Sequence, residues 1–332
     1  MRSFSPADHP VPLVHQLLLS GVAPRPIALV SSIDADGRHN LSPFSYYNAF
    51  GANPPVIVVS PAYRASNGIP KHTFLNIVET GEFTVNAVSY SMVEQISLAS
   101  SDYERGVDEF QKAGFNKRES SLVQPPGVAE SPFIMECRLL QHVSTGGKPG
   151  AGNLLIAEVL MFHVKESAFE NDAIHPRRLD LVARMGGNWY CRANGEALFE
   201  LAKPRQNGVG MDQLPDHIKM STVYTGNDLA KLAGISSLPD VASIRGEWLR
   251  DLLRLGVGLK EPDDLDTELR IHSPRAALLT VFRNIVNGTP AELICTQLQR
   301  VSQGFLAEGD LERAWACALM SDPGLIRSLK TT

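Results

Sequence analysis

Residues 25–88 read RPIALVSSIDADGRHNLSPFSYYNAFGANPPVIVVSPAYRASNGIPKHTFLNIVETGEFTVNAV and contain the strand and turn signals that decide the fold. A run rich in branched apolar residues, Ile27–Ile33, enters the turn Asp34–Gly37, and a second long strand leaves that turn. The later signals follow in order: the break Asn53-Pro54-Pro55, a strand Val56–Ser60, the tripeptide Lys71-His72-Thr73, a short helix and a strand Phe83–Val88. Together they predict a closed sheet with small hydroxyl and amide groups on its rim and one lysine nearby. Such a rim suits a flat, phosphorylated aromatic ligand, and a small β-barrel without a cofactor is the alternative.

The chain up to residue 203 has mainly β signals. The predicted strands are 25–33, 38–50, 55–60, 82–89, 132–144 and 153–165, each rich in Val, Ile, Phe or Leu and bounded by Gly, Pro, Asn or Asp. Short helices are predicted near Thr73–Thr80 and Ser91–Ser100, and residues 101–131 are predicted to form a long loop with one helical turn. These assignments make residues 1–203 one domain.

From Lys203-Pro204 onward the sequence is helical in character, which predicts an all-α extension over residues 204–332. Ser273-Pro274 and Thr289-Pro290 each place a capping hydroxyl before a proline at the first helical position. Thr289 and Glu292 also have capping-box spacing. Two apolar stripes are predicted: Trp248, Leu249, Leu252, Leu253 and Leu255 form one, and Leu278, Leu279, Phe282 and Ile285 form the other. Gly309-Asp310 separates the last two long helical stretches.

Composition narrows the function classes. The 332 residues carry a formal net charge of −5 with both signs mixed along the chain, which disfavours a nucleic-acid-binding surface. The four cysteines are far apart, so we expect reduced thiols rather than disulfides or a zinc site, and the nine histidines show no HxH or HExxH spacing for a metal. The N-terminus lacks signal-peptide features, and no apolar run is long enough to span a membrane. We therefore expect a cytoplasmic protein with no membrane segment.

Two common nucleotide-binding motifs are absent from the sequence. There is no GxxxxGK[ST] loop, and the glycine-rich stretch Gly146–Gly152 has no GxGxxG pattern opening a helix. It lies between two predicted strands, so we interpret it as a hairpin loop. Any nicotinamide nucleotide must then bind without a Rossmann domain.

The order of strands, turns and polar residues closely resembles the FMN-binding split β-barrel of the flavin reductase-like family over roughly residues 10–195. The resemblance implies a mainly β split barrel with short helices, usually a homodimer with FMN at or near the subunit interface. It also implies an FMN-dependent oxidoreductase of the NAD(P)H:flavin reductase type, with hydride transfer from NADH or NADPH to flavin N5. Such transfer needs alignment more than a protein acid or base, so no residue is assigned as a certain catalytic group.

The motif Lys71-His72-Thr73 is the candidate phosphate site. It opens a short helix, where free backbone N–H groups and the helix dipole favour an anion. The family typically has Lys-Asp-Thr here, and His72 replaces the aspartate while both expected phosphate contacts remain. In the alternative interpretation, Thr73 is only an N-cap and Lys71 a solvated surface residue.

Polar residues on the first strands are candidates for contacts to the flavin ring. Alternation of Ser with Phe or Tyr in Ser42–Asn48 supplies hydrogen bonds on one side and apolar contact on the other. The cofactor-binding candidates are Arg25, Ser31, Ser32, Asn40, Ser42, Ser45, Asn48, Ser60, Lys71 and Thr73. Phe44 and Tyr46 are equally well explained as core aromatics, and Arg25 either reaches the flavin or pairs with a surface carboxylate.

The segment Asp180–Tyr190 resembles the R-x-G-G-x-x-Y ending of longer family members. Arg184 and Tyr190 are therefore candidates for the substrate or nicotinamide side of the flavin. The alternative is a plain turn at Gly186-Gly187 with Tyr190 as a packed ring.

Two other functions remain open at this stage. One is an FMN-containing electron-transfer protein, flavoredoxin-like, that serves a partner such as an oxygenase without nicotinamide turnover. The other is a non-enzymatic FMN-binding module whose helical tail binds a partner. For the reductase, the expected partner besides a second copy of the chain is a small-molecule redox substrate, with an oxygenase or an electron-transfer protein as a further partner.

Overall fold

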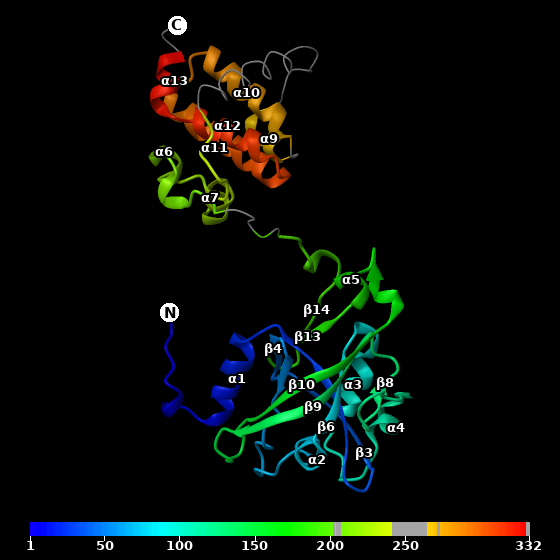
Figure 1. The fold of residues 1–332 in the computed structure, drawn as a ribbon. Coiled ribbons are helices and arrows are strands. Elements are labelled where there is room, and N and C mark those ends of the chain that lie inside the picture. The colour runs from blue at the N-terminus through cyan, green and yellow to red at the C-terminus, as the bar shows by residue number, and fades with distance from the viewer. Residues whose placement is uncertain (202, 204–206, 241–263, 271–272, 330–332) are drawn as a thin grey trace. The chain divides into compact units, whose positions relative to one another are not determined.

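The computed structural model describes residues 1–201, 203, 207–240, 264–270 and 273–329. They divide into two compact units, Met1–Glu200 and Leu201–Thr332 (Figure 1). Each unit has its own hydrophobic core.

The first unit is built on a seven-stranded antiparallel sheet with the strand order β3-β2-β6-β9-β10-β5-β4. The strands are β2 Ala28–Ile33, β3 His39–Phe44, β4 Tyr47–Ala52, β5 Pro55–Val59, β6 Glu82–Ala87, β9 Phe133–Ser144 and β10 Asn153–Val164. The two edge strands, β3 and β4, are consecutive in the chain and are joined only by Ser45 and Tyr46. The sheet must therefore curl until its edges meet at this link, which gives the split barrel that the sequence predicted.

The predicted strands are confirmed to within a few residues, with two corrections. The strand predicted over 38–50 is two strands, because the chain bends at Ser45-Tyr46 to pass from one edge of the sheet to the other. The strand predicted over 25–33 is also divided: β1 (Arg25–Pro26) leaves the barrel sheet and pairs with β13 (Val182–Arg184).

Alternation along β2 places side chains in two different cores. Ala28 and Val30 point into the barrel, whereas Leu29 packs on the opposite face with α3 (Val93–Ala99) and α4 (Glu109–Ala113). Helix α2 (His72–Thr80) covers one end of the barrel through Phe74 and Ile77. The helix begins at His72 with Lys71 in the N-cap, so the alternative assignment of Thr73 as the N-cap is wrong.

A small sheet, β1-β13-β14, lies beside the barrel sheet, with β14 at Tyr190–Arg192. The Gly146–Gly152 stretch joins β9 to β10, as expected of a hairpin loop. The other elements of this unit are η1 Pro6–Asp8, α1 Val11–Gly21, η2 Tyr90–Met92, β7 Lys117–Arg118, β8 Gly127–Val128, η3 Glu166–Ala168, β11 Phe169–Glu170, β12 Ala173–Ile174, α5 Pro176–Leu179 and η4 Gly195–Ala197.

Every secondary-structure element described in the second unit is a helix. Its elements are η5 Met211–Gln213, α6 Asp216–Lys219, α7 Gly226–Ala233, α9 Leu265–Arg270, α10 Pro274–Val286, α11 Ala291–Glu308, α12 Leu311–Met320 and α13 Pro323–Leu329. Leu298, Phe305 and Trp315 are fully or almost fully buried at its centre. None of the helices described here is long and apolar enough to cross a membrane.

The helices of the second unit begin and end close to the residues that the sequence predicted, with small differences. Helix α10 begins at Pro274 after Ser273, as predicted, whereas α11 begins at Ala291 with Pro290 rather than Thr289 in the N-cap. Gly309-Asp310 separates α11 from α12 as expected. Within the predicted stripe of α10, Leu278 is buried but Phe282 is exposed. The stripe predicted at 248–255 lies outside the described residues.

Candidate functional site

The first turn of α2 is tied to the sheet by buried polar side chains. Asn40 on β3 donates from Nδ2 to Thr73 Oγ1 at 2.8 Å, and Thr73 is 1% exposed. Asn40 is paired in register with Ser32 on β2, and Ser32 Oγ accepts from Asn76 Nδ2 at 3.3 Å. Because Thr73 Oγ1 accepts from Asn40, the Thr73 hydroxyl proton is left for another acceptor, although the side chain is buried. Three predicted site residues are thus brought together, and Asn76 is a fourth that the sequence did not single out.

Basic side chains surround this helix terminus. Lys71 Nζ lies 3.7 Å from Asp102 Oδ1, and Arg64 donates to the same oxygen from Nη2 at 2.8 Å. Arg105 belongs to the same group: burial, together with the charges of Arg64 and Arg105, lowers the pKa of His72. Asp102 is the carboxylate partner of both Lys71 and Arg64, whereas Arg105 also lies 3.8 Å from Asp34 Oδ2; the positive charge left over at Lys71 and Arg64 favours an anion.

The Lys71 side chain makes no capping hydrogen bond to α2, so the N-terminal backbone donors of this nine-residue helix lack a side-chain cap. Hydroxyl, ammonium and backbone donors are the groups that bind a phosphate. This donor set fits the phosphate end of a flavin mononucleotide. The replacement of the family's aspartate by His72 removes a negative charge from the same place.

Ser60 follows β5 and lies at the junction with the β9–β10 loop. Its Oγ accepts from the Asn153 backbone N–H at 3.1 Å, and a Cβ added at Gly152 would lie 3.1 Å from that oxygen. The side chain of Asn153 donates to the Pro61 carbonyl at 3.1 Å. The Ser60 hydroxyl proton is left for another partner, although Ser60 itself is buried.

Ser31 and Ser32 project to opposite faces of β2, since neighbouring strand residues alternate. Ser32 contacts α2, whereas Ser31 Oγ is buried without a hydrogen-bond partner among the described residues. A single ligand therefore cannot contact both side chains, and the sequence could not say which serine faces α2.

Arg25 is 4% exposed, and its guanidinium is directed at backbone carbonyls. It donates to Leu19 O and Val22 O at the end of α1, and to Met185 O in the β13–β14 turn at 2.9 Å. Burial lowers the pKa of this group. Its Nε also lies 3.3 Å from Ser45 Oγ. Arg25 thus positions Ser45 and contacts carbonyls instead of the surface carboxylate considered above.

The remaining polar candidates lie along the edge strands. Ser42 on β3 is half-buried, and Asn48 on β4 is exposed, with Oδ1 accepting from the Ala49 N–H at 2.8 Å. Tyr46 lies at the bend and its ring meets His15 edge-on at 6.5 Å between centroids. Phe44 packs against the barrel core, as the structural alternative for that residue predicted.

Arg184 and Tyr190 are cross-strand neighbours in the β13–β14 hairpin. The guanidinium of Arg184 lies 4.5 Å from the Tyr190 ring centroid, and its Nη2 donates to Gly187 O at 2.8 Å. Arg184 is also opposite Arg25 in the register of β1 and β13. Because Arg25 also contacts Ser45, the Arg184–Tyr190 pair lies close to Ser45. Both side chains remain partly accessible.

Sequence reasoning missed the cations that flank Lys71. Arg64 and Arg105 lie in loops with no strand or helix signal of their own; Arg64 precedes the candidate phosphate motif by a few residues, whereas Arg105 is far from it in the sequence. Among the described residues, no group of three or more His, Cys, Asp or Glu is arranged to hold a metal ion.

Residues 20–180 match the family model described as "Flavin reductase like domain". An uncharacterized protein of Aquifex aeolicus is 33% identical over 189 residues, which are 57% of this chain and 94% of that protein. The solved structure of nitrilotriacetate monooxygenase component B from Bacillus cereus aligns with a TM-score of 0.57 at 35% identity, covering 60% of this chain and 98% of that one. The Pseudomonas fluorescens 2-nitrobenzoate 2-nitroreductase NbaA aligns with a TM-score of 0.54 at 26% identity, covering 61% and 97%.

Proposed function

Because this chain belongs to the flavin reductase-like family, we propose that its first unit binds FMN and acts as an FMN-dependent oxidoreductase reduced by NADH or NADPH. The observation that carries the proposal is the donor set at the N-terminus of α2. Thr73 offers a free hydroxyl proton there, and Lys71 and Arg64 share a single carboxylate partner.

In this proposal the phosphate of FMN is held by Lys71, Thr73 and the N-terminal backbone of α2, with Ser60 as a further donor from the adjacent loop. The buried hydrogen bond from Asn40 fixes the rotamer of Thr73, so the hydroxyl is oriented before the ligand arrives. Asn40 and Ser32 therefore act by positioning. Preorganisation of this kind reduces the entropy lost on binding.

The ring of FMN is proposed to lie along the β3–β4 edge, where Ser42, Ser45 and Asn48 offer hydrogen-bonding groups. Bound FMN would supply the redox chemistry, accepting a hydride at N5 and passing the electrons on. The role of the chain is to hold the flavin edge and leave one face open to a nicotinamide. Arg184 and Tyr190 are proposed to align that second nucleotide, since the cation of Arg184 can meet a phosphate or carboxamide oxygen.

The names of two similar proteins support a proposal for the electron acceptor. One is a component of a monooxygenase, and the other is a nitroreductase. We propose that this chain reduces a small-molecule acceptor or supplies a partner oxygenase or electron-transfer protein, and that it works as a cytoplasmic homodimer. Light scattering of the FMN-loaded protein tests the dimer directly.

The phosphate site is tested by the double variant Lys71→Ala/Thr73→Ala. Two charge-assisted contacts are removed, so FMN should bind about 10- to 100-fold more weakly. Lys112→Ala/Thr80→Ala is the matched control: Lys112 is an exposed cation on α4, and Thr80 lies at the opposite end of α2. Equal FMN affinity in the two double variants would remove Lys71 and Thr73 from the site.

Turnover is tested by anaerobic absorbance spectra of the FMN-loaded protein after addition of NADH and then NADPH. Bleaching of the flavin bands within seconds supports the reductase. Bands that persist with both nucleotides, but bleach with dithionite, instead indicate an electron carrier. Arg184→Ala should slow bleaching more than it weakens FMN binding, and equal loss of both would make Arg184 a structural or flavin-binding residue.

A further inference from the structure

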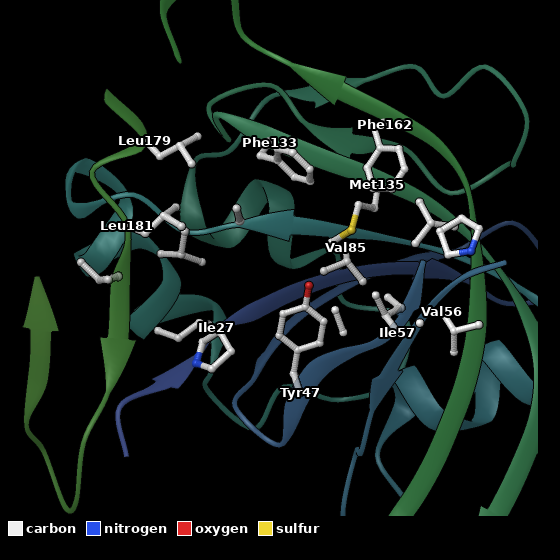
Figure 2. A pocket seen from close by; sticks show the side chains of 18 residues that line it. Ile27, Tyr47, Val56, Ile57, Val85, Phe133, Met135, Phe162, Leu179 and Leu181 are labelled. Atoms are coloured by element: carbon white, nitrogen blue, oxygen red, sulfur yellow. The ribbon is translucent and has the colours of Figure 1, made fainter. Parts of the chain in front are cut away.

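An apolar cavity of about 390 Å³ opens at the end of the barrel opposite α2 (Figure 2). Side chains from several strands converge on it, among them Ile27, Ile57, Val85, Met135 and Phe162. Leu181, immediately before β13, closes one side. The volume lies in the range of small-molecule binding sites, about 300–1,000 Å³.

Strand register separates this cavity from the proposed phosphate site. Ser32 on β2 contacts α2, whereas Ile27, five residues earlier and immediately before β2, lines the cavity. Five residues of a strand span about 16 Å. The barrel core fills the space between the two ends with packed side chains that include Val30 and Phe83. The cavity is therefore a feature of its own and belongs to the other end of the barrel.

Tyr47 supplies the hydrogen-bonding group of the cavity. Figure 2 shows its hydroxyl projecting among Val85 and Met135. Among the side chains that line the cavity it carries the only hydroxyl, and this oxygen has no hydrogen-bond partner in the described part of the chain. Burial raises the pKa of Tyr47 to about 12, so the group remains a neutral donor at physiological pH.

Water fills such a cavity poorly. An ordered internal water needs two to four polar partners, and the lining side chains offer one hydroxyl among aliphatic and aromatic groups. An apolar molecule that enters displaces little ordered water and gains dispersion contacts with the side chains that line the cavity. A hydrogen-bond acceptor on that molecule would also satisfy the Tyr47 hydroxyl.

We propose that this cavity binds a small apolar molecule of one or two rings that carries a single hydrogen-bond acceptor, as an aromatic ketone does, with Tyr47 as donor. Ala49 and Phe162 are exposed residues of the lining and mark the way in from solvent. The cavity is separate from the proposed phosphate site, and its occupant is chosen by shape, apolar contact and one hydrogen bond.

The test uses acetophenone and ethylbenzene, which are similar in shape and differ in the carbonyl oxygen. Both are titrated into the FMN-loaded full-length chain and followed by saturation-transfer NMR. Tyr47→Phe should weaken acetophenone about 2- to 10-fold and leave ethylbenzene unchanged, since one neutral hydrogen bond is lost. Tyr46→Phe is the matched control, because that neighbouring ring lies against His15 and does not line the cavity.

A second pair of variants tests the location. Ala49→Phe places a ring in the mouth and should abolish binding of both probes, whereas Ala52→Phe, on the same exposed strand but outside the lining, should not. The proposal is overturned if neither probe binds the wild-type chain, or if Tyr47→Phe and Ala49→Phe leave both affinities unchanged. It is also overturned if removing FMN exposes the probe site, which would make the cavity part of the flavin site. If probe binding is lost as the protein self-associates, a second copy of the chain covers the cavity mouth and the proposal is wrong.

Discussion

Replacing Glu136 by glutamine should lower the free energy of unfolding of the first unit by about 3–5 kcal/mol. Glu136 is 0% exposed, and its Oε1 accepts from the Ser121 N–H and from His163 Nε2, both at 2.6 Å. Its Oε2 accepts from the N–H groups of Leu122 and Val123 at 2.6 and 3.2 Å. This carboxylate therefore fixes the 121–123 backbone against β9.

Glutamine keeps one acceptor oxygen and presents an NH₂ group where the other oxygen was. With the NH₂ group toward Leu122 and Val123, both of these backbone donors lose their acceptor. With the NH₂ group turned the other way, Ser121 loses its acceptor, and His163 can accept only by a change of tautomer that removes the acceptor of Arg118 at Nδ1. Hydrogen bonds to a charged group contribute about 1.5–3 kcal/mol each, so two lost bonds give about 3–6 kcal/mol. Part of this is offset because a buried charge is removed, while side-chain volume hardly changes and leaves no cavity.

Native-state hydrogen exchange measures this loss for the first unit separately from the helical unit, because it is read peptide by peptide. Amides of β9 should exchange faster by about two to three and a half orders of magnitude in Glu136→Gln. Glu158→Gln is the control: it makes the same charge change at a half-buried position of β10 that has no side-chain hydrogen bond among the described residues. If the amides of β9 exchange at the same rate in the two variants, the hydrogen bonds to the Glu136 carboxylate are not a main source of stability.

The effect of Glu136→Gln should also depend on pH. Burial opposes ionisation of Glu136, but hydrogen bonds from Ser121, His163 and Leu122 outweigh it and lower the pKa of the carboxyl. A carboxyl with a lowered folded-state pKa stabilises the fold fully above its unfolded pKa, about 4.3, and loses that contribution as the pH falls through the folded value. The difference in stability between the wild type and Glu136→Gln should therefore shrink on acidification below about pH 4.

Three further outcomes are expected. Gly208→Ala should destabilise the helical unit by about 1–3 kcal/mol in thermal unfolding. The new Cβ would lie 2.6 Å from the Ala233 carbonyl oxygen, a backbone atom that cannot rotate away. Gly226→Ala is the control, because its Cβ would meet open space. Arg25→Lys should lower the melting temperature by several degrees, because one ammonium group cannot reach the carbonyls of both α1 and the β13–β14 turn. An unchanged melting temperature would show that Arg25 does not stabilise the fold by linking these two segments. A thiol reagent should label Cys191 first in the native protein, because it is the only one of the four free cysteines that is not buried, and labelling of Cys191→Ser at the same rate would refute this.

Local patterns were sufficient to predict most of the barrel. Ala28–Ile33 and Pro55–Val59 are rich in branched apolar residues, and prolines, a glycine and an acidic turn mark their ends, so each strand could be placed to within a few residues. The bend at Ser45-Tyr46 could not be predicted, because SPFSYYN is a continuous strand by propensity. It is divided only because the closed sheet needs its two edges joined at that place, which is a tertiary requirement.

Sequence patterns identified some candidate site residues but could not distinguish the two roles that an arginine can have, binding a ligand or packing against backbone carbonyls. Lys71 is the N-cap of α2 and Thr73 lies in its first turn, as the Lys71-His72-Thr73 motif predicted, and Thr73 accepts a hydrogen bond from Asn40. Arg25 carries the same charge as Lys71 but lies where three backbone carbonyls converge, and only the three-dimensional arrangement of α1 and β13 reveals this. Arg64 was missed for the converse reason, since a lone arginine in a loop has no local pattern.

The two-residue link between β3 and β4 also explains how one short segment serves two different environments. Tyr46 occupies the bend and turns toward His15, whereas Tyr47, the first residue of β4, points into the apolar cavity. Because side chains alternate along a strand, Asn48 must then face outward, which is where the structure places it. A link longer or shorter by one residue would exchange these directions, burying the Asn48 amide without a partner and expelling the Tyr47 ring. The length of the link is therefore fixed by the energetic cost of burying that amide as much as by closure of the sheet.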